Sequence, residues 1–163
     1  MDEKKANFSF LESYAKTCGI SVFGVADVRE CKKDFHIEPK DLLEGLDYGI
    51  SIGIRLSDKV LEGIVNEPTT MYSFHYRRVN NLLDETGIKI ANSIQDKGFQ
   101  ALPVPASHIA DWALQLGHVC HRTIARLAGI GFIGRNGLLI HPKFGARVRY
   151  ATILTDMPLS TGT

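Results

Sequence analysis

The chain has 163 residues, of which 44% are hydrophobic and 23% are charged, and its formal net charge is +1. This length and composition predict one globular domain, residues 1–163, with a sizeable core. The near-zero net charge gives no bulk electrostatic reason to expect nucleic acid or an anionic membrane as a partner. No apolar run approaches the roughly 20 residues of a membrane span, and the N-terminus does not lead into a signal-peptide core, so we expect a cytoplasmic location.

The cysteines are Cys18, Cys31 and Cys120, and no two of them form a CxxC pair. Their spacing matches neither a disulfide framework nor a metal site. They are too few to supply all the thiolates of an iron–sulfur cluster. His118 and His121 could face the same side of a helix, but no third ligand can be placed beside them, so we assign no metal ligands.

The first half of the chain alternates helical and strand patterns. Residues 8–18 place apolar side chains at helical spacing, and residues 20–25 form a β-branched, aromatic strand pattern. A connection follows, with a short helix beginning near Pro39. Residues 48–56 alternate aliphatic side chains with small ones, which predicts a strand with one apolar face. The small residues leave space on the other face, for a flat ligand or for a closely packed helix.

Residues 72–97 predict a long core helix that ends before Gly98. Its first turns crowd together tyrosines, a phenylalanine, a histidine and arginines between Tyr72 and Arg78. This cluster indicates either a face for stacking and anion binding or aromatic side chains packed beneath a loop.

The second half begins with a strand at residues 99–104 that Pro103 marks as an edge strand or a strand end. Ser107 and His108 follow it, where α/β proteins commonly contact ligands, although a capping role also explains the serine. Residues 118–127 predict a helix. Two further strands are predicted at 137–141 and 146–155, paired with each other in an antiparallel hairpin.

Between that helix and those strands lies a glycine-rich loop, Ala128 to Gly137. A Rossmann fingerprint needs a strand before the glycines and a helix after them, whereas this chain has the reverse order, so we exclude a dinucleotide fold. A helix C-terminus also repels phosphate. Anion affinity would have to come from loop N–H groups, Arg135, and Arg147 or Arg149, so a cofactor with amides or a delocalised ring is as plausible as a phosphate.

Residues 121–140 with the segment 144–156, which ends in Leu154-Thr155-Asp156, resemble the N-terminal domain of the epoxyqueuosine reductase family. The resemblance implies a nitroreductase-like fold, a bound corrinoid, and a following ferredoxin-like domain with [4Fe–4S] clusters. Gly129, Gly131, Gly134 and Asn136 match the family motif, Arg135 replaces its lysine, Phe132 replaces its tryptophan, and Arg122 matches an upstream arginine.

The chain departs from that family in two places. The proton-donating aspartate of a VDTGP-like segment has no counterpart at 104–107 or 115–118, so we assign no catalytic residue and expect a substrate other than epoxyqueuosine. The chain also ends where the family's cysteine-rich run begins. We therefore expect the ferredoxin-like domain to be absent here and supplied in cis by a longer protein or replaced by an electron donor in trans, and we do not expect tRNA to be a partner of this domain alone.

Together these observations predict an α+β, nitroreductase-like sandwich in which helices flank a mixed β-sheet. The leading hypothesis is the cobalamin-binding domain of an iron–sulfur reductase, with a cleft that Tyr72 and Tyr76 also line; the alternatives are an FMN-binding protein and a docking module without chemistry. The predicted cofactor-binding residues are Ser107, His108, Arg122, Gly129, Gly131, Gly134, Arg135 and Asn136.

Overall fold

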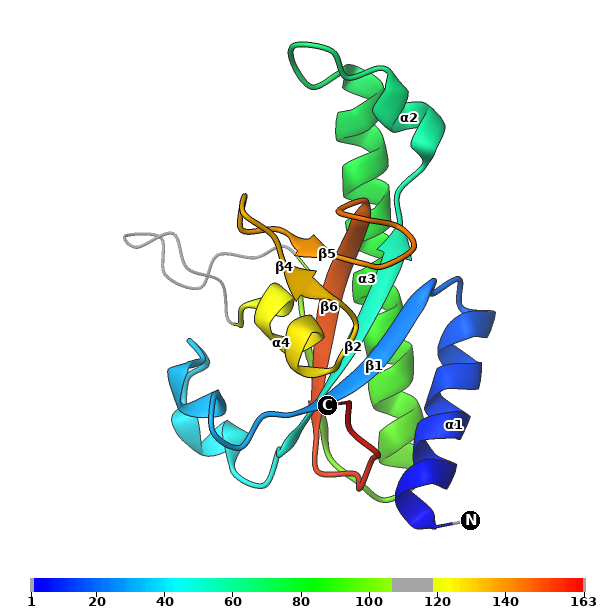
Figure 1. The fold of residues 1–163 in the computed structure, drawn as a ribbon. Coiled ribbons are helices and arrows are strands. Elements are labelled where there is room, and N and C mark those ends of the chain that lie inside the picture. Colours follow the sequence, from blue (N-terminus) through cyan, green and yellow to red (C-terminus); the bar gives the residue numbers. More distant parts are fainter. Residues whose placement is uncertain (1, 107–118, 163) are drawn as a thin grey trace.

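The computed structural model describes residues 2–106 and 119–162. One four-stranded sheet, in the order β1-β2-β6-β3, is covered on one face by α1 and α3 and on the other by α4 and the β4–β5 hairpin (Figure 1). The elements are α1 (Glu3–Thr17), β1 (Val22–Asp27), η1 (Lys32–Asp34), η2 (Lys40–Leu43), β2 (Tyr48–Arg55), α2 (Asp58–Glu62), α3 (Thr70–Asp96), β3 (Ala101–Val104), α4 (His121–Leu127), β4 (Phe132–Ile133), β5 (Leu139–Ile140) and β6 (Val148–Thr155).

Local signals set the ends of the two long helices. Asp2 caps α1 by accepting a hydrogen bond from the Lys5 amide at 3.0 Å, and Thr69 caps α3 through the Tyr72 amide at 3.0 Å. Gly19 and Gly98 follow the helices with φ of 95° and 91°, conformations that glycine adopts without strain. The predicted helices at 8–18 and 72–97 are therefore confirmed, with α1 beginning earlier in the chain.

The alternation in β2 separates the two hydrophobic cores. Ile50, Ile52 and Ile54 belong to the core shared with α1 and α3. On the opposite face, a Cβ at Gly49 would lie 2.9 Å from Val28 Cγ1 and 3.2 Å from Ile124 Cγ2 of α4. Close packing of Val28 and of this helix, rather than space for a flat ligand, therefore explains the small residue at this position.

The α+β class is confirmed, but the prediction of a mixed sheet is wrong for the described strands. Each of the three strand pairs in the main sheet is antiparallel. The β2–α3–β3 connection does make β2 and β3 parallel to each other, yet β6 lies between them and is antiparallel to both. The relation to nitroreductases stays a prediction.

The predicted hairpin between residues 137–141 and 146–155 is also wrong. The β5 strand pairs with β4, whereas β6 enters the centre of the main sheet between β2 and β3. Burial accompanies the difference, because all but one of the eight residues of β6 are buried in a sheet that is covered on both faces, whereas a separate two-stranded hairpin would leave one face open. Among the described helices, none is long and apolar enough to cross a membrane.

Candidate functional site

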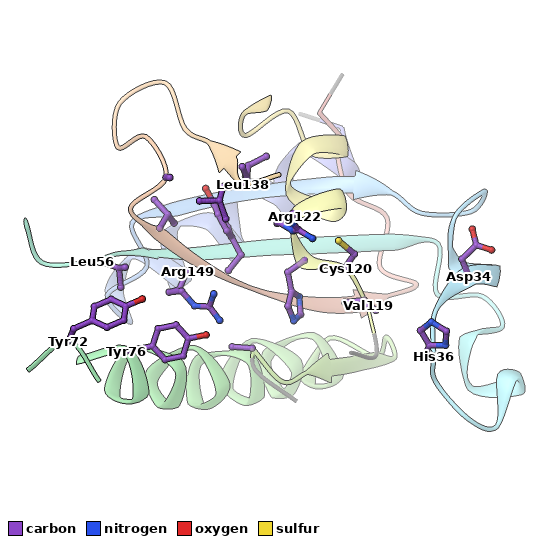
Figure 2. A pocket seen from close by; sticks show the side chains of 16 residues that line it. Asp34, His36, Leu56, Tyr72, Tyr76, Val119, Cys120, Arg122, Leu138 and Arg149 are labelled. Atoms are coloured by element: carbon purple, nitrogen blue, oxygen red, sulfur yellow. The ribbon is translucent and has the colours of Figure 1, made fainter. Parts of the chain in front are cut away.

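The candidate site lies beside a stretch of β6 that has one strand neighbour among residues 2–106 and 119–162. The β3 strand pairs with residues 152–155 of β6, so within these ranges residues 148–151 pair with β2 alone. A cavity of about 690 Å³ opens here between α3, α4 and the β4–β5 hairpin (Figure 2). We call this cavity the cleft; its lining residues are Asp34, His36, Leu56, Tyr72, Tyr76, Ala106, Val119, Cys120, His121, Arg122, Leu138, Leu139, Ala146, Val148, Arg149 and Tyr150.

Two tyrosines and an arginine form one wall of the cleft. The rings of Tyr72 and Tyr76, one turn apart on α3, have centroids 5.8 Å apart. Arg149 reaches from β6 to place its guanidinium 4.4 Å from the centre of the Tyr76 ring, and its Nε donates a 3.4 Å hydrogen bond to Asn80 Oδ1. The cation–π contact holds a positive charge against an aromatic face, an arrangement suited to flat or anionic groups.

His121 joins the first turn of α4 to the sheet. Its Nε2 lies 2.9 Å from the Pro105 carbonyl oxygen, and its Nδ1 lies 2.8 Å from Thr152 Oγ1. A carbonyl oxygen only accepts, so Nε2 carries a proton, and in the neutral ring Nδ1 accepts from the Thr152 hydroxyl. The imidazole thus has a defined tautomer and fixes α4 against β6 at the edge of the cleft.

Cys120 and Arg122 flank this histidine. Burial raises the pKa of the Cys120 thiol, but hydrogen bonds with Thr123 and the positive charge of Arg122 outweigh that effect and leave the pKa below its usual value. Arg122 itself donates a hydrogen bond to the Gly137 carbonyl and so ties α4 to the hairpin turn. It therefore lines the cleft and also positions the hairpin.

Tyr150 is the buried member of the cleft wall. It is 7% exposed, and its hydroxyl has no hydrogen-bond partner in the described part of the chain. Burial raises the pKa of Tyr150 to about 12. At neutral pH the side chain is consequently an uncharged hydrogen-bond donor.

The predicted glycines serve the backbone of the hairpin rather than the cleft wall. Gly129 follows α4 with φ of 78°. A Cβ at Gly131 would lie 2.2 Å from the Ile140 carbonyl oxygen, and one at Gly134 would lie 3.1 Å from Ile140 Cγ1. These positions let β4 and β5 approach each other, and the hairpin in turn contributes Leu138 and Leu139 to the cleft.

Only some of the other predicted residues line the cleft. Asn136 lies in the hairpin turn, where its Oδ1 accepts a 3.1 Å hydrogen bond from the Leu138 amide, and Arg135 is exposed beside it. Among the described residues that the sequence analysis singled out, the cleft is lined by Arg122, Arg149, Tyr72 and Tyr76. Arg135, Asn136 and Arg147 do not line it. Ser107 and His108 lie outside the described residues.

Sequence reasoning missed Cys120, His121 and Tyr150 as residues of one site. The sequence placed Cys120 and His121 at the start of a predicted helix and Tyr150 in a predicted strand. These patterns do not reveal that the described β3 pairs only with residues 152–155 of β6, and that pairing is what brings the three residues to one cleft.

No protein-family model matches the chain. Among curated proteins, a tetrachloroethene reductive dehalogenase of Dehalobacter restrictus is 29% identical over 143 residues, which are 87% of this chain and 22% of that protein. A tetrachloroethene reductive dehalogenase of Desulfitobacterium hafniense is 28% identical over the same shares. The chain thus spans about a fifth of the length of these relatives.

Solved structures share the fold. A catabolic reductive dehalogenase superposes over 99% of this chain and 22% of its own, with a TM-score of 0.81 and 18% identity. A reductive dehalogenase described through B12-dependent dehalogenation gives a TM-score of 0.67 over 99% of this chain and 21% of its own, with 15% identity. Epoxyqueuosine reductase from Streptococcus thermophilus gives a TM-score of 0.66 over 95% of this chain and 47% of its own, with 21% identity. The chain therefore shares its α+β fold with reductive dehalogenases and epoxyqueuosine reductases, whereas the nitroreductase-like part of the expectation stays a prediction.

Proposed function

We propose that this chain is the corrinoid-binding domain of a reductase, with cobalamin as its cofactor and the cleft as its site. The observation that carries the proposal is the cleft itself, which lies beside the open stretch of β6 in a fold shared with reductive dehalogenases and epoxyqueuosine reductases. The reaction class that these proteins' names have in common is reduction, and we extend that class to the whole protein to which this domain contributes.

The residues of the cleft fit part of a corrinoid. The cleft volume of about 690 Å³ lies within the range of small-molecule sites, about 300–1,000 Å³, and the rest of a molecule as large as cobalamin would lie outside it. Aromatic and aliphatic side chains suit the apolar faces of a macrocycle, whereas Arg122, Arg149 and Tyr150 offer donors to polar substituents at its edge. The buried Tyr150 hydroxyl has no partner in the described chain, as expected if a ligand supplies its hydrogen-bond acceptor.

The chain's own contribution is binding and orientation. A bound corrinoid supplies a cobalt centre that accepts and donates electrons. Leu138 and Leu139 cover the cleft from the hairpin side and exclude water, whereas Arg149, held over Tyr76, keeps its charge at the opposite wall. His121 keeps α4 in place and so sets the distance between these walls.

The remaining site residues enter the proposal with different support. Gly129, Gly131 and Gly134 act indirectly, by shaping the hairpin that carries Leu138 and Leu139. Arg135 and Asn136 lie on the hairpin turn, at a place from which they could contact a part of the ligand that extends beyond the cleft. Ser107 and His108 stay predictions.

We further propose that electrons arrive from a ferredoxin-like domain with [4Fe–4S] clusters in cis, or from a donor protein in trans. The chain's three cysteines cannot hold such clusters. An iron–sulfur module with its own cysteines must therefore lie elsewhere in the protein or in a partner. We do not propose the FMN alternative, because the similar proteins above are reductive dehalogenases and epoxyqueuosine reductases.

Titration of the purified chain with hydroxocobalamin, followed by its visible spectrum, tests the proposal. Tyr76→Leu removes the ring beneath Arg149 and is expected to weaken cobalamin binding about three- to tenfold, because the ligand loses an aromatic face and Arg149 loses the ring that holds it at the cleft wall. Phe10→Leu is the matched control, because Phe10 makes a similar contact with Lys97, at 4.2 Å, on α1 and away from the cleft. Binding of FMN instead of cobalamin, or binding of neither, would refute the proposal.

A further inference from the structure

The Tyr150 hydroxyl is a buried polar group in a cavity wall with no hydrogen-bond partner in the described chain. The ring lies across Gly53 of β2, where an added Cβ would meet ring carbons at 2.9 and 3.0 Å. Buried tyrosine hydroxyls normally find a partner. Ser51 and Thr86 also carry buried hydroxyls without a partner among residues 2–106 and 119–162, but neither lines the cleft. Tyr150 alone of these three could therefore be completed by a ligand.

The surroundings of Tyr150 select the chemistry of that partner. The side chain stays protonated at neutral pH because burial raises its pKa to about 12, so it donates. It belongs to an apolar cluster that includes Val148, Leu139 and Leu154. Arg149 is adjacent in sequence but points to the other face of the sheet, where it stacks on Tyr76. The other arginine of the cleft, Arg122, donates to the Gly137 carbonyl of the hairpin turn. Both arginines already have partners in the chain, so a charged acceptor at the Tyr150 hydroxyl would lose its hydration for one hydrogen bond from a neutral donor, and a neutral carbonyl oxygen would lose much less.

We infer that Tyr150 donates a hydrogen bond to a neutral carbonyl oxygen of the ligand in the cleft. The inference rests on the proposed function, and it assigns the contact to a particular part of a corrinoid. The carboxamide groups at the edge of the macrocycle carry such oxygens, whereas the nucleotide tail of cobalamin carries a charged phosphate. Tyr150 therefore recognises the ring periphery and is indifferent to the tail.

The test compares Tyr150→Phe with wild type and with the control Tyr14→Phe, which changes a tyrosine of α1 outside the cleft. Each protein is titrated with cobalamin and with cobinamide, which keeps the carboxamides and lacks the nucleotide. We expect Tyr150→Phe to bind both corrinoids about three- to tenfold more weakly, the net worth of one neutral hydrogen bond. Tyr14→Phe should bind both as wild type does. Without ligand, Tyr150→Phe should melt no lower than wild type, because its hydroxyl has no partner in the described chain to lose.

Each other outcome is informative. If wild type binds both corrinoids and Tyr150→Phe binds them equally well, the inference is wrong and the proposed function stands. If Tyr150→Phe weakens cobalamin binding alone, the acceptor lies in the nucleotide tail and the assignment to the carboxamides is overturned. If wild type binds neither corrinoid, the proposed function and this inference both fail.

Discussion

Replacement of Gly131 by alanine tests whether the glycine-rich segment is required for close approach of the backbone. The added Cβ would lie 2.2 Å from the Ile140 carbonyl oxygen and 3.0 Å from its carbon. These are backbone atoms that no side-chain rotation can move away, so β4 and β5 have to separate. We expect a cost of about 3 kcal/mol, the upper part of the usual range for overpacking. For a chain of this size that lowers the melting temperature by about 6–12 °C.

Gly45→Ala is the matched control for this substitution. Gly45 has φ of 81°, and a Cβ there would meet nothing within 4 Å. Only backbone strain remains, which should cost about 1 kcal/mol of folding free energy and lower the melting temperature by about 2–4 °C. Thermal unfolding followed by circular dichroism compares the two variants. A melting temperature of Gly131→Ala equal to or above that of Gly45→Ala would refute the contact between Gly131 and Ile140.

Two further predictions concern titrating side chains. Burial and the Lys143 charge hold the pKa of His141 below its usual value, so the unfolded chain binds more protons, and stability falls as the pH drops below about 6.5. The melting temperature of His141→Asn should fall less between pH 7.5 and 5.5 than that of wild type; an equal fall would contradict the assignment. The pKa of Cys120 is lowered, whereas burial raises that of Cys31, so iodoacetamide at neutral pH should modify Cys120 before Cys31, as peptide mass spectrometry would show. Faster modification of Cys31 would contradict this order.

The parts of the fold that depend on neighbouring residues could be predicted from the sequence. Helix caps and helix-ending glycines such as Thr69 and Gly98 act within one turn of a helix. The alternation of Ile50 and Ile52 with small residues shows which face of β2 is apolar. Strand pairing is different, because it depends on which distant segments compete for a neighbour. The position of β6 between β2 and β3 is set by burial on both faces, which a local hairpin pattern does not reveal.

In the candidate site, too, local features could be predicted from the sequence, whereas contacts between distant segments could not. The absence of a Cβ predicted close approach at Gly131, and the structure shows that approach, but to Ile140 of the same hairpin. A single sequence cannot tell whether a glycine admits a ligand or another strand, since both need the same missing atom. Tyr150 could not be singled out, because the cleft depends on β3 pairing only with residues 152–155.

Hydrogen–deuterium exchange of the chain with and without cobalamin is the most direct test of the claim that the cleft is the corrinoid site. We expect cobalamin to slow amide exchange at residues 148–151 of β6 and at the start of α3, with no change in α1 (Figure 1). A second depression, lined by Arg29, Lys33 and Lys40, is the internal comparison. Slower exchange there, with residues 148–151 unaffected, would contradict the assignment of the corrinoid to the cleft.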